Sequence, residues 1–83
     1  EVEDCLADHE AVEEVAVVGV EDERFGQRLR AFVVLRRDVD PDVLKAHVRA
    51  NLAAYKVPRD VVVLDELPRN ATGKVLKRVL AAS

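Results

Sequence analysis

The stretch VEEVAVVGVEDERFGQRLRAFVVLRR, residues 12–37, decides the fold expected for this chain. Residues 12–20 are rich in valine and are typical of a buried strand. The polar residues 21–27 follow, where Gly26 can adopt the positive φ of a tight turn. Residues 28–37 alternate between polar and apolar, which places Leu29, Ala31, Val33 and Leu35 on one face of a second strand. Because the link is short, the sequence predicts an antiparallel pair.

Helical patterns flank this hairpin. Residues 1–9 carry apolar side chains at helical spacing: Val2, Cys5, Leu6 and His9. No capping residue stands ahead of them, so we expect the chain to be cut from a longer protein. Asp40 is an expected N-cap, Pro41 suits the first position of a second helix, and Pro58 ends that helix. Its buried stripe would be Leu44, Val48, Leu52 and Tyr55.

Two more elements complete the chain. Residues 60–67 predict a third strand, and Val75, Leu76, Val79 and Leu80 mark a short final helix. The predicted order is therefore α-β-β-α-β-α. Such an order indicates a single domain over residues 1–83, a small three-stranded sheet packed by helices, in the α+β class.

Composition excludes several classes of protein. Cys5 is the single cysteine, so no disulfide forms within the chain, and with two histidines it cannot build a zinc cluster. We therefore predict no metal site. The lack of disulfides fits a reducing, cytoplasmic location. No apolar run approaches the roughly 18 residues that span a bilayer.

Charge is divided unevenly along the chain. Residues 1–23 contain ten acids and no Lys or Arg, for a sum of −10, whereas residues 24–83 carry thirteen basic and six acidic residues, for +7. The two sums give the net charge of −3. Four basic residues gather near the C-terminus, without an acid between them: Arg69, Lys74, Lys77 and Arg78. Such a cluster suits a phosphate-bearing partner, although a solvated helix end is the commoner explanation.

Lys74 follows several turn-forming residues at the expected start of the final helix, which Thr72 or Asn70 could cap. Cations are disfavoured at a helix N-terminus, but helix amides and a lysine ammonium together hold anions. An incidental exposed lysine is the alternative. The segment is not a phosphate-binding P-loop, because Pro68 stands where the first glycine is required and Val75 follows the lysine.

Other polar residues predict no chemistry. His9 and His47 lie on expected helices without a carboxylate at catalytic spacing, and Cys5 fits the apolar stripe. Asp65 and Glu66 fit a turn. One alternative function is a free-standing phosphate- or RNA-binding module, but the sequence lacks a Gly-x-x-Gly clamp and paired strand aromatics, and its acidic first part would repel nucleic acid. A purely structural domain is another.

The segment LPRNATGKVLKRVL, residues 67–80, resembles the closing signature of adenylate-forming enzymes. Residues 1–35 are similar to the stretch that follows the hinge motif of this family, and residues 52–68 to the segment before its lysine. Three such segments in the same order are specific for the family, and the motif RNATGK, residues 69–74, looks most like that of acyl- or aryl-CoA synthetases. The resemblance implies a mobile C-terminal lid domain over residues 1–83, with the hinge and the N-terminal AMP-binding domain missing.

The same resemblance implies roles for individual residues. Lys74 matches the lysine that assists attack of a carboxylic acid substrate on the α-phosphate of ATP, which binds with Mg mainly on the missing domain. The lid then turns for thioester formation with coenzyme A. Thr72 and Gly73 would support the lysine loop, and Arg69, Lys77 and Arg78 are candidate phosphate contacts. The spacing from Pro68 to Lys74 also resembles a target of a lysine acetyltransferase and deacetylase, and acetylation would remove the charge.

Overall fold

The computed structural model describes residues 1–24 and 26–82. Its elements, in chain order, are α1 (Val2–Ala7), β1 (Val12–Asp22), β2 (Gly26–Leu35), α2 (Pro41–Asn51), a 3-10 turn η1 (Ala54–Lys56), β3 (Asp60–Val63) and α3 (Lys77–Ala81). The predicted order α-β-β-α-β-α and the α+β class are confirmed. None of the helices in the described part of the chain is long and apolar enough to cross a bilayer.

The three strands form one mixed sheet with β2 in the centre. β1 and β2 pair antiparallel, as their short link predicts, from Val12 opposite Leu35 to Asp22 opposite Gly26. Gly26 has a φ of 80°, which supplies the expected positive value at the turn. The predicted turn also includes residue 25, which lies outside the described residues. β3 pairs parallel to β2, because the chain crosses over through α2 before it returns.

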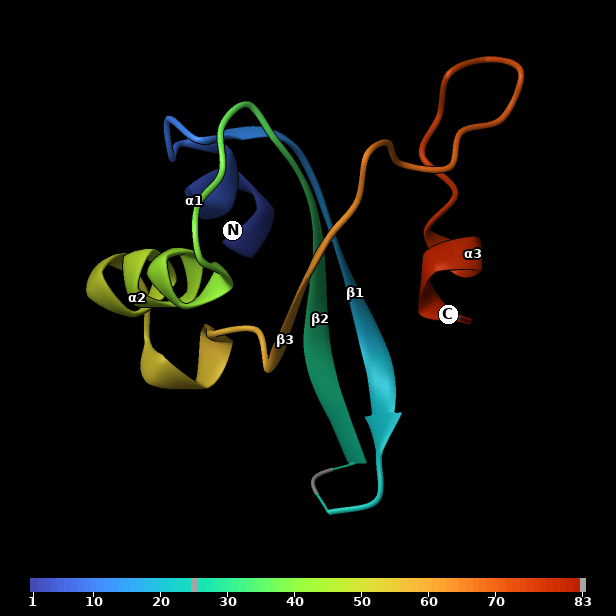
Figure 1. Ribbon diagram of the computed structural model, residues 1–83. Helices are drawn as coiled ribbons and strands as arrows, with labels where there is room; N and C mark the ends of the chain where they lie inside the picture. The colour runs from blue at the N-terminus through green and yellow to red at the C-terminus, as the bar shows by residue number, and fades with distance from the viewer. Residues whose placement is uncertain (25, 83) are drawn as a thin grey trace.

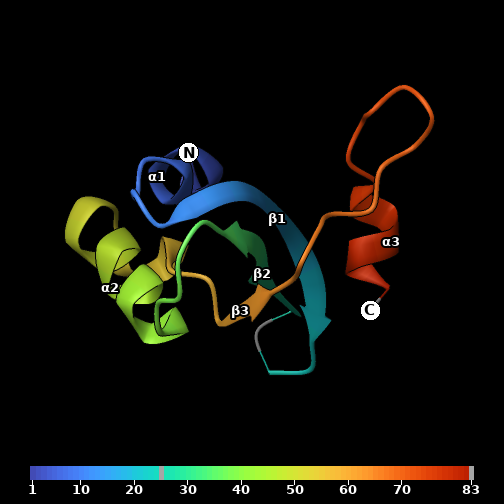
Figure 2. The ribbon, with the colours of Figure 1, turned by 45° about the horizontal axis from the view of Figure 1, so that its top comes forward.

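Apolar side chains fill both faces of this sheet. Figures 1 and 2 show α1 and α2 on one face and α3 on the other. The cluster under α1 and α2 contains Leu6, Val12, Ala31, Val33, Leu44 and Val48. The cluster under α3 contains Ala16, Val18, Phe32, Val34, Leu67 and Leu80. The consecutive residues 31–34 of β2 thus alternate between two cores, as expected of a central strand covered on both sides.

The second helix ends earlier than the sequence predicts. Asp40 caps it by accepting a hydrogen bond from the amide of Asp42, and Leu44 and Val48 are buried, as expected. However, the helix stops at Asn51, whose side-chain amide donates to the carbonyl of His47. The chain leaves the helix at the C-cap Leu52, whose backbone is extended, with φ −131° and ψ 171°. The predicted stripe therefore does not reach Tyr55, which is 82% exposed.

Two further boundaries differ from the prediction. The segment after α2 continues as η1, not as part of the predicted helix, and Lys56 in η1 forms an ion pair with Glu1. β3 ends at Val63, and the chain then bends at Asp65 and Glu66, as their turn-forming character predicts. The segment from residue 64 leads across the sheet to α3, and buries Leu67 in the second core on the way.

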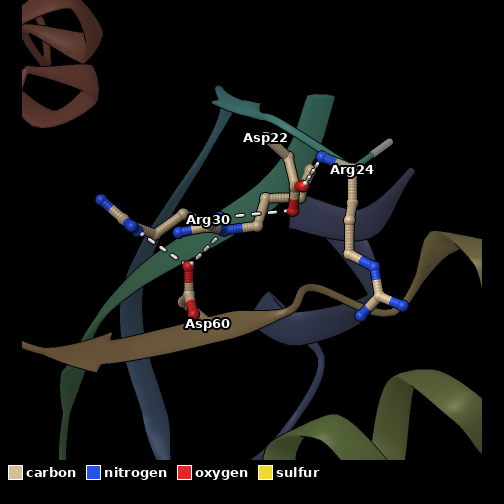
Figure 3. Close-up of polar contacts among 5 residues, drawn as sticks. Asp22, Arg24, Arg30 and Asp60 are labelled. Carbon is tan, nitrogen blue, oxygen red and sulfur yellow. Dashed lines mark hydrogen bonds and ion pairs between the residues drawn. The ribbon is translucent and has the colours of Figure 1, made fainter. Parts of the chain in front are cut away.

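An ion-pair network fixes the start of β3 against the sheet. The carboxylate oxygen Oδ2 of Asp60 accepts hydrogen bonds from Nε of Arg28 at 3.0 Å and Nε of Arg30 at 3.1 Å. Arg28 also contacts Asp22 at 3.3 Å. Figure 3 shows Asp60 reaching from β3 towards Arg30 on the neighbouring strand. This network lies towards the β1–β2 turn, at the bottom of Figure 1, whereas the loop before α3 lies at the top.

Candidate functional site

Lys74 lies in a closed loop that precedes α3, which we call the lysine loop and define as residues 69–75. An antiparallel bridge between Arg69 and Val75 closes its base. The amide of Leu76 donates to the carbonyl of Pro68 at 2.9 Å, which secures the same closure. In Figure 1 the loop stands out from the body of the sheet beside α3. Lys74 is therefore held on a projecting segment.

The prediction that Lys74 begins the final helix is wrong. α3 begins at Lys77, its N-cap is Leu76, and no side chain caps it. Thr72 is therefore not a helix cap. The reason is Gly73, whose φ of 85° belongs to the left-handed region and interrupts any helix at this point. The turn-forming residues close a loop instead, and Gly73 supplies the backbone freedom expected beside the lysine.

Asn70 organises the interior of the lysine loop. Its side-chain oxygen accepts hydrogen bonds from the amide of Thr72 at 3.0 Å, the hydroxyl of Thr72 at 2.7 Å and the amide of Lys74 at 3.0 Å. Its own amide donates to the carbonyl of Lys74 at 3.0 Å. Thr72 thus supports the loop by bonding to Asn70. This is the Asx-type turn that asparagine favours.

A groove of about 750 Å³ lies beside the lysine loop. Glu3, Val15 and Ala16 line one side, and Asn70 and residues 74–78 line the other. The groove therefore brings together Lys74, Lys77 and Arg78 with the apolar edge of β1. Its volume is in the range of small-molecule sites, which run from about 300 to 1,000 Å³.

Two acids from the first part of the chain neutralise two of the basic residues. Arg69 forms an ion pair with Glu14 and also donates to the carbonyl of Gly73 at 2.7 Å. Glu3 lies 2.6 Å from Lys77. Partial burial alone would raise the pKa of Glu3, but hydrogen bonds from Lys77 and the Val17 amide outweigh it and hold the pKa below its ordinary value.

Lys74 and Arg78 differ from these two. Both side chains are exposed, and within residues 1–24 and 26–82 no carboxylate forms an ion pair with either. Lys74 can therefore present an uncompensated ammonium to a ligand in the groove or on a facing surface. The sequence predicted the exposed lysine, but the acids that engage Arg69 and Lys77 were visible only as the charge of −10 over residues 1–23.

The remaining polar candidates have structural roles. His47 bonds through Nε2 to the carbonyl of Cys5 at 2.9 Å, which joins α2 to α1. His9 lies after α1, not on it, and its Nδ1 accepts from the amide of Ala11 at 3.1 Å. Cys5 packs half-buried against the first core, as expected. The described residues hold no group of three His, Cys, Asp or Glu side chains placed to bind a metal ion.

Comparison with known proteins assigns the family. Residues 1–74 match the AMP-binding enzyme C-terminal domain family. The chain belongs to this family. Lys74 is the last residue of the matched range, so the match includes the lysine loop up to the lysine itself. Membership in this family does not favour a free-standing RNA-binding module.

Similar proteins are CoA ligases. The 2-succinylbenzoate–CoA ligase of Geobacillus kaustophilus is 51% identical over 96% of this C-terminal domain, and the long-chain-fatty-acid–CoA ligase of Bacillus subtilis is 45% identical over 96%. The chain spans only 17% and 15% of these two relatives.

Solved structures agree with this assignment. The fatty acyl CoA synthetase of Mycobacterium tuberculosis aligns over 99% of this domain and 16% of that chain, with a TM-score of 0.92 and 37% identity. The o-succinylbenzoate CoA synthetase of Bacillus subtilis was solved in complex with an acyl-adenylate intermediate. It aligns over 96% of this domain and 16% of that chain, with a TM-score of 0.90 and 42% identity.

Proposed function

We propose that this domain is the lid of an ATP-dependent acid–thiol ligase and that Lys74 is its catalytic residue for acyl-adenylate formation. The observation that carries the proposal is the placement of Lys74. Its ammonium stands on a projecting, hydrogen-bonded loop beside a groove, with no ion pair to an acid of the described chain. An internal salt bridge would occupy the charge that the reaction needs.

The chemistry requires a cation at this point. A carboxylate and a triphosphate repel each other as the carboxylate oxygen approaches the α-phosphorus. A new bond forms between the carboxylate oxygen and the α-phosphorus while the bond from that phosphorus to pyrophosphate breaks. Negative charge grows on the phosphoryl oxygens as this happens. A lysine that contacts both reactants offsets the repulsion and stabilises this charge. One such preorganised donor is commonly worth about 3–4 kcal/mol in the transition state.

The rest of the enzyme supplies the other parts. We assign ATP with its Mg²⁺, and the carboxylic acid, mainly to an N-terminal AMP-binding domain joined to this chain by a hinge. The 15–17% share of each relative that the chain spans supports this division. After adenylation the lid turns, which withdraws Lys74 and lets coenzyme A attack the acyl-adenylate, with release of AMP. Each half-reaction then has its own face of the lid.

Arg78 is a second candidate for phosphate contact. It lines the same groove as Lys74 and is exposed. For Arg69 and Lys77, phosphate contact stays a prediction, and both would first have to exchange their present partners, Glu14 and Glu3. A charge-reversed Arg78 should raise the Michaelis constant for ATP or for coenzyme A in the full-length enzyme.

Reversible acetylation of Lys74 would switch off adenylation. The exposure of the side chain on a projecting loop supports access by a modifying enzyme, and acetylation would remove its charge. Mass spectrometry of the protein from its own host, grown on varied carbon sources, tests this idea. A Lys74 peptide that is unmodified under every condition contradicts it.

The test of the catalytic proposal is carboxylate-dependent ATP–pyrophosphate exchange by the full-length enzyme. Lys74→Ala should lower the exchange rate by about 10²- to 10³-fold, the cost of removing one such donor. Lys45→Ala is the matched control, because Lys45 lies on α2, away from the lysine loop. Equal exchange rates in the two variants would contradict the proposal.

A further inference from the structure

The outer part of the lysine loop, residues 70–74, is not held in place by packing. Residues 70–74 are all exposed, and the buried residues nearest in sequence are Leu67 and Leu80. An exposed loop of this kind normally samples many conformations, because few apolar contacts oppose its conformational entropy. The direction of Lys74 must therefore depend on hydrogen bonds within the loop.

Five of these hydrogen bonds involve Asn70. In addition to the bonds to Thr72 and Lys74, its carbonyl accepts from the amide of Gly73 at 2.9 Å. Asn70 thereby holds both backbone polar groups of Lys74. The Lys74 amide donates to the Asn70 side chain, and the Lys74 carbonyl accepts from the Asn70 amide. The position of the Lys74 backbone is set from both sides by one residue.

The outer tether of the loop acts at a different point. Arg69 donates to the carbonyl of Gly73 and forms an ion pair with Glu14 on β1. It fixes the loop relative to the sheet and holds the carbonyl of the Gly73–Lys74 peptide, whereas the amide of that peptide is held by Asn70. Exposed ion pairs of this kind contribute only about 0.2–1 kcal/mol. The side chain that bonds directly to the backbone of Lys74 is that of Asn70.

We infer that Asn70 is a positioning residue for the adenylation step, a role that rests on the proposed function of Lys74. Its side-chain oxygen holds the Lys74 backbone so that the ammonium is preorganised before ATP and the acid arrive. Alanine at position 70 would remove three accepted hydrogen bonds and free the loop. A displacement of a catalytic group by about 1 Å can cost about 10²-fold in rate.

The experiment compares two half-reactions in the full-length enzyme. Asn70→Ala should lower kcat for ATP–pyrophosphate exchange by about 10- to 100-fold, while the Michaelis constant for ATP changes little. Thioester formation from preformed acyl-adenylate should be spared, because it does not use Lys74. Asn51→Ala, which also removes an exposed asparagine that bonds to backbone, is the matched control and should leave both half-reactions unchanged.

Two further variants separate positioning from simple destabilisation. Asn70→Ser keeps a neutral side-chain oxygen that can accept hydrogen bonds within the loop, although more weakly than asparagine, and should recover part of the loss seen with alanine. In a Lys74→Ala background, Asn70→Ala should cause no additional loss of exchange, since residues that act through one another are non-additive.

Several results would overturn the inference. They are an unchanged exchange rate in Asn70→Ala, an equal fall in both half-reactions, no recovery in Asn70→Ser, or a full additional loss in the Lys74→Ala background. The single variant Lys74→Ala keeps the two proposals distinguishable. If exchange survives in Lys74→Ala, the proposed function fails. If exchange collapses there but survives in Asn70→Ala, only the positioning role fails.

Discussion

The carboxylate oxygen Oε2 of Glu3 lies 2.6 Å from Nζ of Lys77 and accepts a hydrogen bond from the amide of Val17 at 2.7 Å. One side chain of α1 therefore connects β1 to the first residue of α3. The contact neutralises a cation three residues after Lys74 and fixes the side of the groove that Lys77 forms. The acidic first part of the chain thus has a structural use beside the lysine loop.

Removal of this ion pair should have a small effect on stability. Glu3→Gln keeps an oxygen for the Val17 amide but loses the charge, so the free energy of unfolding should fall by about 0.2–1 kcal/mol, as for exposed pairs in general. Urea unfolding measures this, with Glu13→Gln as the exposed control on β1. An equal effect of Glu3→Gln in wild type and in a Lys77→Gln background would contradict a direct interaction.

The Asp60 network predicts a pH dependence. Partial burial raises the pKa of Asp60, but hydrogen bonds from Arg28 and Arg30 outweigh it, so the pKa lies below the ordinary value of 3.8. A carboxylate whose pKa is lower in the folded than in the unfolded state stabilises the fold at pH values above its unfolded pKa. This contribution is lost as the pH falls through the folded pKa. Asp60→Asn should therefore flatten the acid fall in unfolding free energy that begins below about pH 5.

Urea midpoints measured at a series of pH values check this prediction. Arg30→Gln removes one of the two donors and should flatten the profile in the same direction, by less than Asp60→Asn. Parallel acid profiles for Asp60→Asn and wild type would show that the ion pairs do not lower the pKa of Asp60.

The backbone at Gly73 predicts a local requirement for glycine. Gly73→Ala forces a Cβ into a φ of 85°, a strain of about 1–2 kcal/mol, and should reduce ATP–pyrophosphate exchange more than thioester formation. Gly19→Ala is the matched control, because Gly19 has no positive φ and its added Cβ would meet only Gln27 at 3.5 Å. Full exchange activity in Gly73→Ala would mean that this conformation is not needed.

The second core predicts how α3 is attached. Leu80 is 2% exposed and belongs to the cluster on the α3 face of the sheet, whereas its neighbour Val79 is 50% exposed. Leu80→Ala should lower the free energy of unfolding by about 2–5 kcal/mol, and Val79→Ala should change it by less than about 0.5 kcal/mol. Thermal or urea unfolding of both variants decides this, and equal effects would contradict the observed face of α3.

Much of the fold follows from local sequence patterns. The valine-rich residues 12–20, the polar turn and the second run at 28–37 predict the hairpin, because strand and turn signals agree. The role of β2 as central strand was less visible. Alternation indicates one buried face, whereas Phe32 and Val34 on the other face are buried because α3 and the segment leading to it cover that face. That crossing is a tertiary property.

The sequence pointed to Lys74 as the candidate residue, but it did not predict the conformation of the loop that carries it. The segment around Lys74 carries the family resemblance, yet helical periodicity at residues 75–80 extended the expected helix back to the lysine. The left-handed Gly73 and the Asn70 hydrogen bonds override that periodicity. Tyr55 likewise lies outside the predicted stripe, because the backbone becomes extended at Leu52 and α2 ends before the stripe is complete.

The role of Lys74 in adenylation is tested most directly by measuring the two half-reactions separately in the full-length Lys74→Ala enzyme. ATP–pyrophosphate exchange and thioester formation from preformed acyl-adenylate are measured on the same folded preparation. If Lys74 acts in adenylation, exchange falls by about 10²-fold or more while thioester formation stays near the wild-type rate. Exchange at the wild-type rate, or an equal loss in both half-reactions, would contradict a role of Lys74 in adenylation.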